Sequence, residues 1–288
     1  MIIMMYIFDP TQFPELGHHF YKGDGFSYRY QMSKKLFLKS IYIPLGPNCD
    51  SKQGFDNFLN HIKSLKFTKT KIDLPTIYEN KKSIEVVKKV KAAGFKQAKY
   101  IQDEETLLVI QDDLHLPHSE MNQVRNGLKK ANIIIKNELS DEELRQVYDV
   151  YLIAAKRLEI TPKDIAIFKK LSEKCQAVLA YNIETKNLDG FLLNYLVETN
   201  LSDITGNKDD NKLLLSMYTG LTDEGRNCQI GRAIYYESYT SAFEKMGVNV
   251  IDFHGASRSK GRSYMGFKLS FSKRFLSLPG SFEKIRLI

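Results

Sequence analysis

The chain predicts an α/β fold, and three features of its pattern lead to this expectation. Short apolar runs typical of strands alternate with segments whose apolar residues recur at helical spacing. Glycines and prolines mark the joins between these segments. With 288 residues, of which 43% are hydrophobic and 26% charged, the chain can bury one large core or two moderate ones.

The first element expected is a β-hairpin. Two apolar, Tyr-rich runs at 26–30 and 36–45 flank the polar segment Ser33-Lys34-Lys35, which predicts the turn. The apolar opening at 1–8 lacks a basic leader and a cleavage site, and it ends at Asp9-Pro10. It predicts a buried first strand rather than a signal segment.

An alternation of helices and strands follows the hairpin. Helices are predicted at 55–65 and 83–93, and strands at 70–74 and 105–110. In the second helix Ile84, Val87 and Val90 would share the buried face, and Gly94 would end the helix.

The polar stretch at 111–118 breaks this pattern, and Pro117 suits a helix start. Beyond it the alternation resumes, apart from a polar segment at 200–211 that we expect to be a flexible loop. The predicted helices lie at 120–130, 141–158, 161–175 and 231–246. The predicted strands lie at 178–181, 190–197, 212–218 and 248–253, before a basic Ser/Gly-rich loop at 256–264.

Charge, cysteine spacing and the length of the apolar stretches indicate which partners the protein has and where it is located. Lys and Arg number 42 against 34 Asp and Glu, a formal charge of +8, which favours phosphate-bearing partners. Cys49, Cys175 and Cys228 are isolated, which argues against a disulfide framework or zinc site and indicates a cytoplasmic setting. No stretch approaches the roughly 18 continuous apolar residues of a membrane span, so we expect a soluble protein.

Six segments carry a family resemblance, in collinear order over nearly the whole chain. They are Tyr42-Ile43-Pro44-Leu45-Gly46-Pro47, Lys91-Ala92-Ala93-Gly94-Phe95, Arg125-Asn126-Gly127-Leu128-Lys129-Lys130-Ala131, the stretch 147–157, the stretch 246–255 with Ile251-Asp252-Phe253-His254-Gly255, and Gly266-Phe267-Lys268-Leu269-Ser270-Phe271. Together they resemble the motifs of the FemABX family of non-ribosomal peptidyltransferases, and their shared order argues against chance.

The resemblance implies a fold of two GNAT-like subdomains facing a cleft. Residues 1–113 would form the first subdomain, with a C-terminal strand within 272–288 returning to it, and residues 114–271 the second. The chain has no room for the long helical arm of some members. It is similar to the short members that act on a UDP-linked precursor.

The resemblance also implies an activity. The protein would be an aminoacyltransferase that moves an amino acid from aminoacyl-tRNA to a peptidoglycan precursor, UDP-linked or lipid-linked, during interpeptide-bridge formation. No cofactor and no metal are expected. The protein would act as a monomer, and the resemblance allows a peripheral contact with the membrane.

Lys268 is the first candidate for a catalytic group. Aminoacyl transfer develops negative charge on the ester carbonyl and on the departing ribose oxygen, and a positioned cation lowers that barrier. Lys268 stands between Phe267 and Phe271, where aromatic packing could fix an ammonium group. The alternative is a strand lysine whose ammonium lies in solvent. By the resemblance, Phe267 would lie along the adenosine end of the donor.

Four further residues are candidates for substrate binding. By the resemblance, Lys22 would contact the nucleotide diphosphate and Tyr218 would line the precursor site; a surface lysine and ordinary strand packing are the alternatives. Where short members carry R-x-x-x-Y, this chain has Lys163 and Ile167, which keeps a charge but loses the bidentate fork. In the family, an acidic residue that closes the strand before the boundary is a candidate base. By the resemblance, Asp112 or Asp113 would take this place only with a register shift, and surface carboxylates at a turn are the alternative.

Basic clusters suggest where tRNA phosphates would bind, with a solvated basic face as the alternative. The candidates are Arg125, Lys129, Lys130, Arg258, Lys260 and Arg262. The histidines do not have the spacing or partners of a zinc set; they include His18, His19, His115, His118 and His254.

Two rival functions stay open. Gln229-Ile230-Gly231-Arg232-Ala233 partly resembles the Q-x-x-G-x-A turn that holds the pyrophosphate of coenzyme A at a helix start, which would indicate a GNAT acyltransferase using acyl-CoA. A basic RNA-binding protein without transfer chemistry is the non-enzymatic rival.

Overall fold

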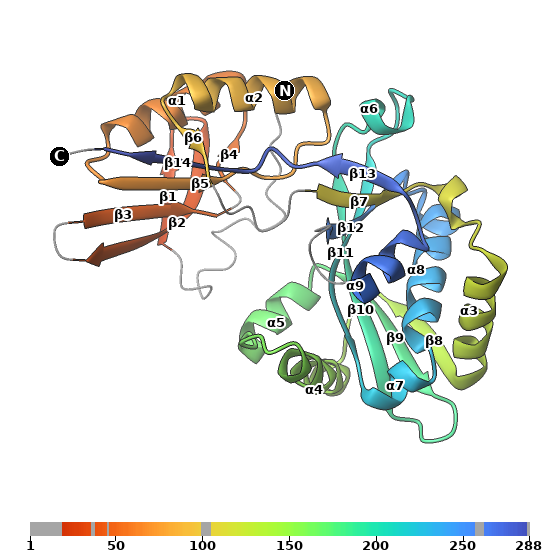
Figure 1. Ribbon diagram of the computed structural model, residues 1–288. Coiled ribbons are helices and arrows are strands. Elements are labelled where there is room, and N and C mark those ends of the chain that lie inside the picture. The colour runs from red at the N-terminus through yellow and green to blue at the C-terminus, as the bar shows by residue number, and fades with distance from the viewer. Residues whose placement is uncertain (1–18, 36–37, 45, 99–104, 257–261, 287–288) are drawn as a thin grey trace.

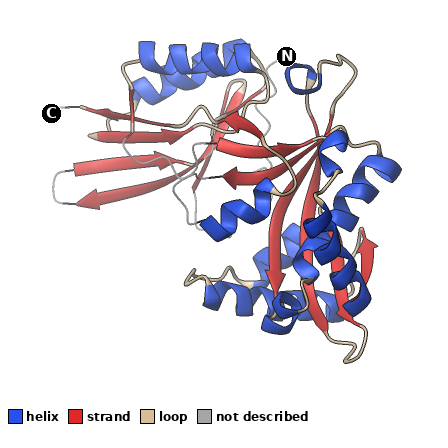
Figure 2. Ribbon diagram, turned by 45° about the vertical axis from the view of Figure 1, so that its right-hand side comes forward, coloured by secondary structure: helices blue, strands red, loops and turns tan. Residues whose placement is uncertain are grey.

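The computed structural model describes residues 19–35, 38–44, 46–98, 105–256 and 262–286. Within those residues the strands form two sheets of seven strands each. Figure 1 shows the first sheet on the left beneath helices α1 and α2, and the second sheet on the right between two groups of helices; Figure 2 shows both from a second direction. We call the two units the first and the second subdomain.

The first sheet has the strand order β1-β2-β3-β5-β14-β6, with β4 beside β2. Its apolar face packs against α1 (Lys52–Ser64) and α2 (Asn80–Ala92) around Phe55, Phe58 and Ile72. The strands are β1 His19–Gly23, β2 Phe26–Lys35, β3 Leu38–Ile43, β4 Asn48–Cys49, β5 Lys69–Asp73, β6 Lys96–Gln97 and β14 Ser281–Ile285.

The predicted hairpin is confirmed, but its turn is not where the sequence placed it. Ser33 pairs with Ser40 and Lys34 with Lys39, so the ladder continues through the supposed turn. These residues are polar because the end of the hairpin is exposed, not because the chain reverses there. The predicted opening strand at 1–8 lies outside the described residues.

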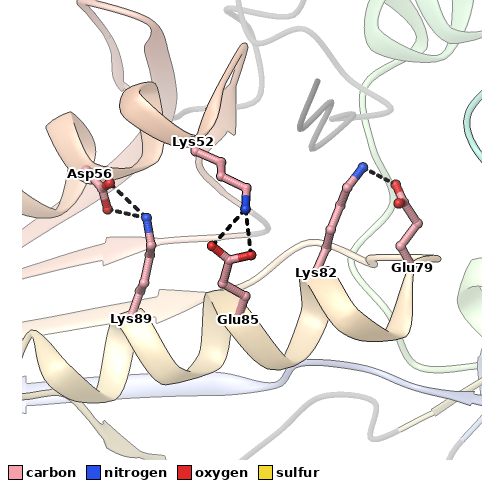
Figure 3. Close-up of polar contacts among 6 residues, drawn as sticks. All are labelled: Lys52, Asp56, Glu79, Lys82, Glu85 and Lys89. Carbon is pink, nitrogen blue, oxygen red and sulfur yellow. Dashed lines mark hydrogen bonds and ion pairs between the residues drawn. The ribbon is translucent and has the colours of Figure 1, made fainter.

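Helix α2 turns inward two of the three residues expected on its buried face. Val90 is buried and Val87 packs against the core, whereas Ile84 is 56% exposed and Val86 is buried in its stead. Gly94, at φ +85°, does end the helix as predicted. Three ion pairs tie α2 to α1 or to its own first turn: Lys52 with Glu85, Lys89 with Asp56, and Lys82 with Glu79 (Figure 3).

The second sheet has the order β13-β7-β12-β11-β10-β9-β8. Helices α3 and α8 cover one face, and α4 and α5 the other. Its strands are β7 Glu105–Val109, β8 Ala131–Lys136, β9 Gln176–Asn182, β10 Leu188–Glu198, β11 Lys212–Leu221, β12 Val250–Ala256 and β13 Arg274–Ser277. Its helical segments are η2 Gln111–Leu114, α3 His118–Lys130, α4 Asp141–Arg157, α5 Ile165–Ser172, α6 Ser202–Thr205, α7 Asp223–Asn227, α8 Ile230–Met246 and α9 Arg262–Leu269.

The division of strands between the sheets differs from the expected boundary after residue 113. Strand β7, expected to complete the first part, pairs with β12 and β13 in the second sheet. The chain therefore passes from one sheet to the other between Ala98 and Glu105. In return, β14 pairs antiparallel with β5 and β6 in the first sheet, where the returning strand was expected.

Side chains connect the two subdomains beside this exchange of strands. Tyr78, between β5 and α2, donates a hydrogen bond of 2.7 Å to Asp252 of β12. The backbone amide of Asn80 donates to Asp203 of α6 at 2.9 Å. Asp203 belongs to a short helix within 200–211, a segment that the sequence predicted to be a structureless loop.

None of the helices in the described ranges is both long and apolar enough to cross a membrane.

Candidate active site

The candidate site lies where two parallel strands of the second sheet separate. The ladder between β11 and β12 covers residues 213–215 and 250–252, and β11 then continues without β12 beside it. A pocket of about 310 Å³ opens at this point. Its lining comes from β11, the strand end at Phe253 and His254, the C-terminal turn of α4, the first turns of α8, and α9.

Lys268 lies in this pocket with its ammonium group held by the strand end. The residue is 3% exposed, and Nζ donates to the carbonyl oxygens of Phe253 at 3.0 Å and His254 at 2.7 Å. Nζ also lies 5.2 Å from the centre of the Phe253 ring. Burying an ammonium group is costly, and hydrogen bonds to carbonyl groups offset part of that cost. Lys268 belongs to helix α9, so the strand lysine in solvent, kept as an alternative, is wrong.

Asp252 fixes the strand end that holds Lys268. Its carboxylate is 1% exposed and accepts hydrogen bonds from the hydroxyl of Tyr78, the hydroxyl of Thr106 and the backbone amide of His254. The bond to His254 is 2.7 Å long. His254 has φ +61°, a left-handed conformation that is unfavourable for a histidine and that this bond helps to maintain. One buried carboxylate thus connects the first subdomain to the backbone around Lys268.

Phe267 also lines the pocket and packs within an aromatic cluster. Its ring contacts those of Tyr235, Phe253 and Phe271 at centroid distances of 5.4, 6.0 and 5.6 Å. The guanidinium of Arg232 lies 5.2 Å from the Phe267 ring centre and forms an ion pair with Glu120 at 2.5 Å. The same guanidinium donates hydrogen bonds to Gln123 of α3 and to Ser270. Three side chains therefore hold Arg232 in place against the Phe267 ring.

Tyr218 and Lys163 lie on the side of the second subdomain that approaches the first. Tyr218 lines the pocket and contacts the rings of Tyr151 and Phe168. Burial raises the pKa of Tyr218, so its hydroxyl stays protonated at neutral pH. Burial and then the positive charge of Arg29, in β2, lower the pKa of Lys163. Arg29 of the first subdomain and Lys163 of the second are therefore close enough for their positive charges to repel each other.

Of the four substrate candidates only Tyr218 lines the pocket described above; Lys163, Lys22 and Asp113 do not. Lys22 is exposed on β1, in register with Ser27 of β2. Asp113 is engaged locally: its carboxylate accepts from the amide of Ile110 at 3.1 Å, from Ser272 at 2.9 Å and from Arg274 at 3.0 Å. A carboxylate with these partners stabilises a turn and the start of β13.

The structure describes the side chains of only three of the six basic candidates for tRNA binding. Arg125, Lys129 and Lys130 are exposed on α3, and Lys130 lies 3.5 Å from Glu184. Arg258 and Lys260 lie outside the described residues. Arg262 begins α9, but its side chain is not described.

Several residues of the site were not identified from the sequence. Asp252 is part of a motif, but nothing in the pattern indicates that its carboxylate reaches Tyr78, which lies 174 residues earlier. Arg232 is part of the partial coenzyme A motif, but its ion pair with Glu120 joins two helices that are distant in the sequence. No motif or spacing in the sequence indicated that Arg29 would lie near Lys163. In the described part of the chain, no three His, Cys, Asp or Glu side chains gather in a way that could hold a metal ion.

Comparison with known proteins identifies the fold. No protein-family model matches the chain. No curated protein matches it in sequence either. Among solved structures, FemX superposes with a TM-score of 0.67 at 16% identity, covering 96% of this chain and 90% of FemX. L-PGS from Bacillus licheniformis gives a TM-score of 0.66 at 9% identity, covering 93% and 84%.

A tandem GNAT protein from the clavulanic acid biosynthesis pathway is similar as well, with a TM-score of 0.50 at 10% identity, covering 90% of this chain and 78% of that protein. The chain therefore has a fold of two GNAT-like subdomains, of the kind found in FemX. The predicted fold class is confirmed.

Proposed function

We propose that the protein is an aminoacyltransferase that uses aminoacyl-tRNA as donor and an amine of a peptidoglycan precursor as acceptor. The main support is the position of Lys268, a buried ammonium group at a pocket between two separating strands. The FemABX-like motifs and the fold shared with FemX support the choice of donor and acceptor.

In the reaction, the acceptor amine attacks the ester carbonyl carbon that joins the amino acid to the tRNA ribose. A carbon–nitrogen bond forms, the carbon–oxygen bond to ribose breaks, and the proton lost by the amine ends on the ribose oxygen. Negative charge develops first on the carbonyl oxygen and then on the ribose oxygen. The Lys268 ammonium would stabilise that charge, because it is already oriented by the carbonyl groups of Phe253 and His254.

The substrates would approach the pocket from two sides. Phe267 would lie along the terminal adenosine of the tRNA, and Arg125, Lys129 and Lys130 on α3 would contact its phosphates. The acceptor would lie toward the first subdomain, with Tyr218 and Lys163 near its peptide and Lys22 near its diphosphate. Asp113 is not proposed as a base, because its oxygens already accept three hydrogen bonds.

A product assay tests this proposal directly. The protein would be incubated with a mixture of charged tRNAs and either a UDP-linked or a lipid-linked precursor, and the precursor analysed by mass spectrometry. We expect a mass increase of one amino-acid residue that disappears when the tRNA is deacylated beforehand. No increase with either precursor, from a folded protein, would contradict the proposal.

Replacing Lys268 by Met tests the proposed catalytic group. Met retains most of the side-chain length, so we expect kcat to fall by roughly two to three orders of magnitude, about 3–4 kcal/mol, with little change in KM. Steady-state kinetics measures both constants, and thermal melts check folding. Lys273→Met is the matched control, since Lys273 is exposed five residues away and should keep full activity. Full kcat in a folded Lys268→Met protein would exclude the mechanism.

One observation favours acyl-CoA as an alternative donor. The pocket borders Gly231 in the first turn of α8, where backbone amides not used within the helix favour an anion such as a pyrophosphate. Coenzyme A would raise the unfolding temperature of an acyl-CoA enzyme and leave a tRNA-dependent enzyme unchanged.

A further inference from the structure

The net positive charge of the chain comes from the first subdomain. Residues 19–98 contain 16 Lys and Arg against 6 Asp and Glu, a difference of +10. Residues 105–277 contain 23 of each, a difference of zero. The formal charge of +8 is therefore not a property of the pocket region, and the proposed tRNA contacts do not explain it.

Much of this charge gathers at the end of the first sheet that points away from the second subdomain (Figure 1). We call this surface the distal rim. Its cations come from β2, β3, the end of α1, the loop after α1, the start of β5 and the residue after β14. They are Lys34, Lys39, Lys63, Lys66, Lys69 and Arg286.

Hydrogen bonds show that these segments form one surface. The amide of Thr68 donates to the carbonyl of Lys39, and the amide of Arg286 donates to the carbonyl of Thr68, both at 2.8 Å. The Arg286 guanidinium also binds the carbonyl groups of Leu65 and Lys63, at 2.8 and 2.6 Å. The chain segments that carry the six cations are thus held together rather than scattered.

Large apolar side chains are exposed among these cations. Leu38 is 60% exposed, Ile285 61% and Met32 52%. Leu38, Lys69 and Ile285 lie on one face of the sheet, because Ser40 and Ile285 both pair with Lys69. Lys34 and Lys39, which pair with each other, lie on the other face, so the two sets of side chains meet at the end of the strands. Nearby, Glu283 is already bound by Lys69 at 2.8 Å and does not offset the other charges.

We propose that the distal rim docks on an anionic lipid surface. Lysines around aliphatic side chains suit this partner, since the ammonium groups attract lipid headgroups while the aliphatic groups enter the boundary of the acyl chains. Nucleic-acid surfaces instead combine cations with aromatic rings that stack on bases, whereas the large apolar groups exposed on the described part of the rim, Leu38, Ile285 and Met32, are not aromatic. The proposal concerns attachment and does not depend on the transfer reaction.

Vesicle binding tests the proposal. The full chain would be mixed with vesicles of phosphatidylcholine, with or without about one third phosphatidylglycerol, and the bound fraction measured by flotation. We expect binding to the anionic vesicles alone, weakened by salt. The triple variant Lys34→Gln/Lys39→Gln/Lys66→Gln should lower the partition coefficient about a hundredfold, at about 1 kcal/mol per lysine. Leu38→Ser/Ile285→Ser should lower it about tenfold.

Matched controls separate a local surface from overall charge. Lys81→Gln/Lys208→Gln/Lys245→Gln removes three exposed lysines elsewhere, and Ile84→Ser/Ile160→Ser removes two apolar side chains at least half exposed; neither should change binding more than about twofold. Equal losses in the rim and control variants would overturn the proposal. So would failure of the unmodified chain to bind anionic vesicles, or a loss of tRNA affinity in the rim variants as large as their loss of vesicle binding.

Discussion

At the scale of single residues, Asp252 joins the interface between the subdomains to the backbone that orients Lys268. It accepts from Tyr78 on one side and from the amide of His254 on the other. The carbonyl of His254 then accepts from Lys268. Asp252 does not line the pocket, so we regard it as a positioning residue for the ammonium group.

We predict that Asp252→Asn lowers kcat about tenfold with little change in acceptor KM. Asn keeps one acceptor oxygen but cannot accept from two hydroxyl groups and an amide, so the turn at His254 should loosen. Thr106→Val is the matched control, because it removes one hydrogen bond to Asp252 and leaves the bond between Asp252 and the amide of His254 in place. Kinetics and thermal melts on both variants decide the matter: a similar loss of kcat in Thr106→Val would show that Asp252 contributes stability alone.

His61 makes a separate prediction about pH. The His61 ring stacks on Tyr21 at 4.2 Å, and its Nε2 lies 2.9 Å from the Tyr28 hydroxyl. Burial lowers the pKa of His61, so below the ordinary value the unfolded chain binds a proton that the folded chain does not. Stability should therefore fall as pH drops below about 6.5. We expect His61→Gln to show a smaller decrease in Tm between pH 7.5 and pH 5; an equal decrease would contradict this assignment.

The sequence could identify residues that act through short motifs but not those that act through distant partners. Lys268, Phe267 and Tyr218, each chosen from a motif, do line one pocket, although the helix that carries Lys268 and Phe267 was not predicted. Asp252 and Arg232 could not be assigned, because their partners Tyr78 and Glu120 are remote in the chain.

At the scale of elements, close packing of α3 on α8 holds the wall of the pocket. A Cβ atom on Gly127 would lie 2.9 Å from both the Cβ of Ala233 and the carbonyl oxygen of Gln229. The latter is backbone and cannot yield without moving a helix. Gly127 therefore permits the distance at which Gln123 of α3 reaches Arg232.

We predict that Gly127→Ala destabilises the protein by about 1–3 kcal/mol, although alanine is the better helix former. The expected fall in Tm is several degrees, at roughly 2–4 °C per kcal/mol for a chain of this size. Gly266→Ala in α9 is the matched control, because its Cβ would meet nothing within 4 Å, and its Tm should stay or rise slightly. A Tm unchanged in Gly127→Ala would show that α3 can shift freely.

The pattern predicted elements well where one face was apolar and a turn marked the end. Ser140 caps the start of helix α4 and forms a capping box with Glu143, a local signal that the sequence carries. Strand β8 was missed because Ala131 follows directly on the last residue of α3, without a turn between them. Helix α9 was missed because its eight residues have no clear apolar face.

At the scale of the whole molecule, the two subdomains are joined by exchanged segments as well as by contacts. Strand β7 lies before the expected boundary but belongs to the second sheet, and β14 returns to the first. Sheet membership depends on which strands pair over long distances in the chain, which hydrophobic periodicity cannot indicate. The order of elements was predictable, but the residue at which the chain changes sheets was not.

The distribution of charge leads to a last prediction, concerning tRNA. If Arg125, Lys129 and Lys130 contact phosphates, uncharged tRNA should bind with an affinity that falls steeply with salt. Each lost contact lowers the log–log slope by about 0.7–0.9, so Arg125→Gln/Lys129→Gln/Lys130→Gln should reduce it by about two to three.

The control Lys174→Gln/Lys208→Gln/Lys245→Gln removes the same charge from exposed positions of the same subdomain, none of them on α3 or on the turn 183–187 that is bonded to its end. Its slope should stay close to that of the unmodified protein, because exposed charges farther away than about 8–10 Å are screened at physiological salt. Fluorescence anisotropy over a series of salt concentrations measures all three slopes. If the α3 variant and the control behave alike, tRNA does not bind along α3, and the path of the donor to the pocket must lie elsewhere.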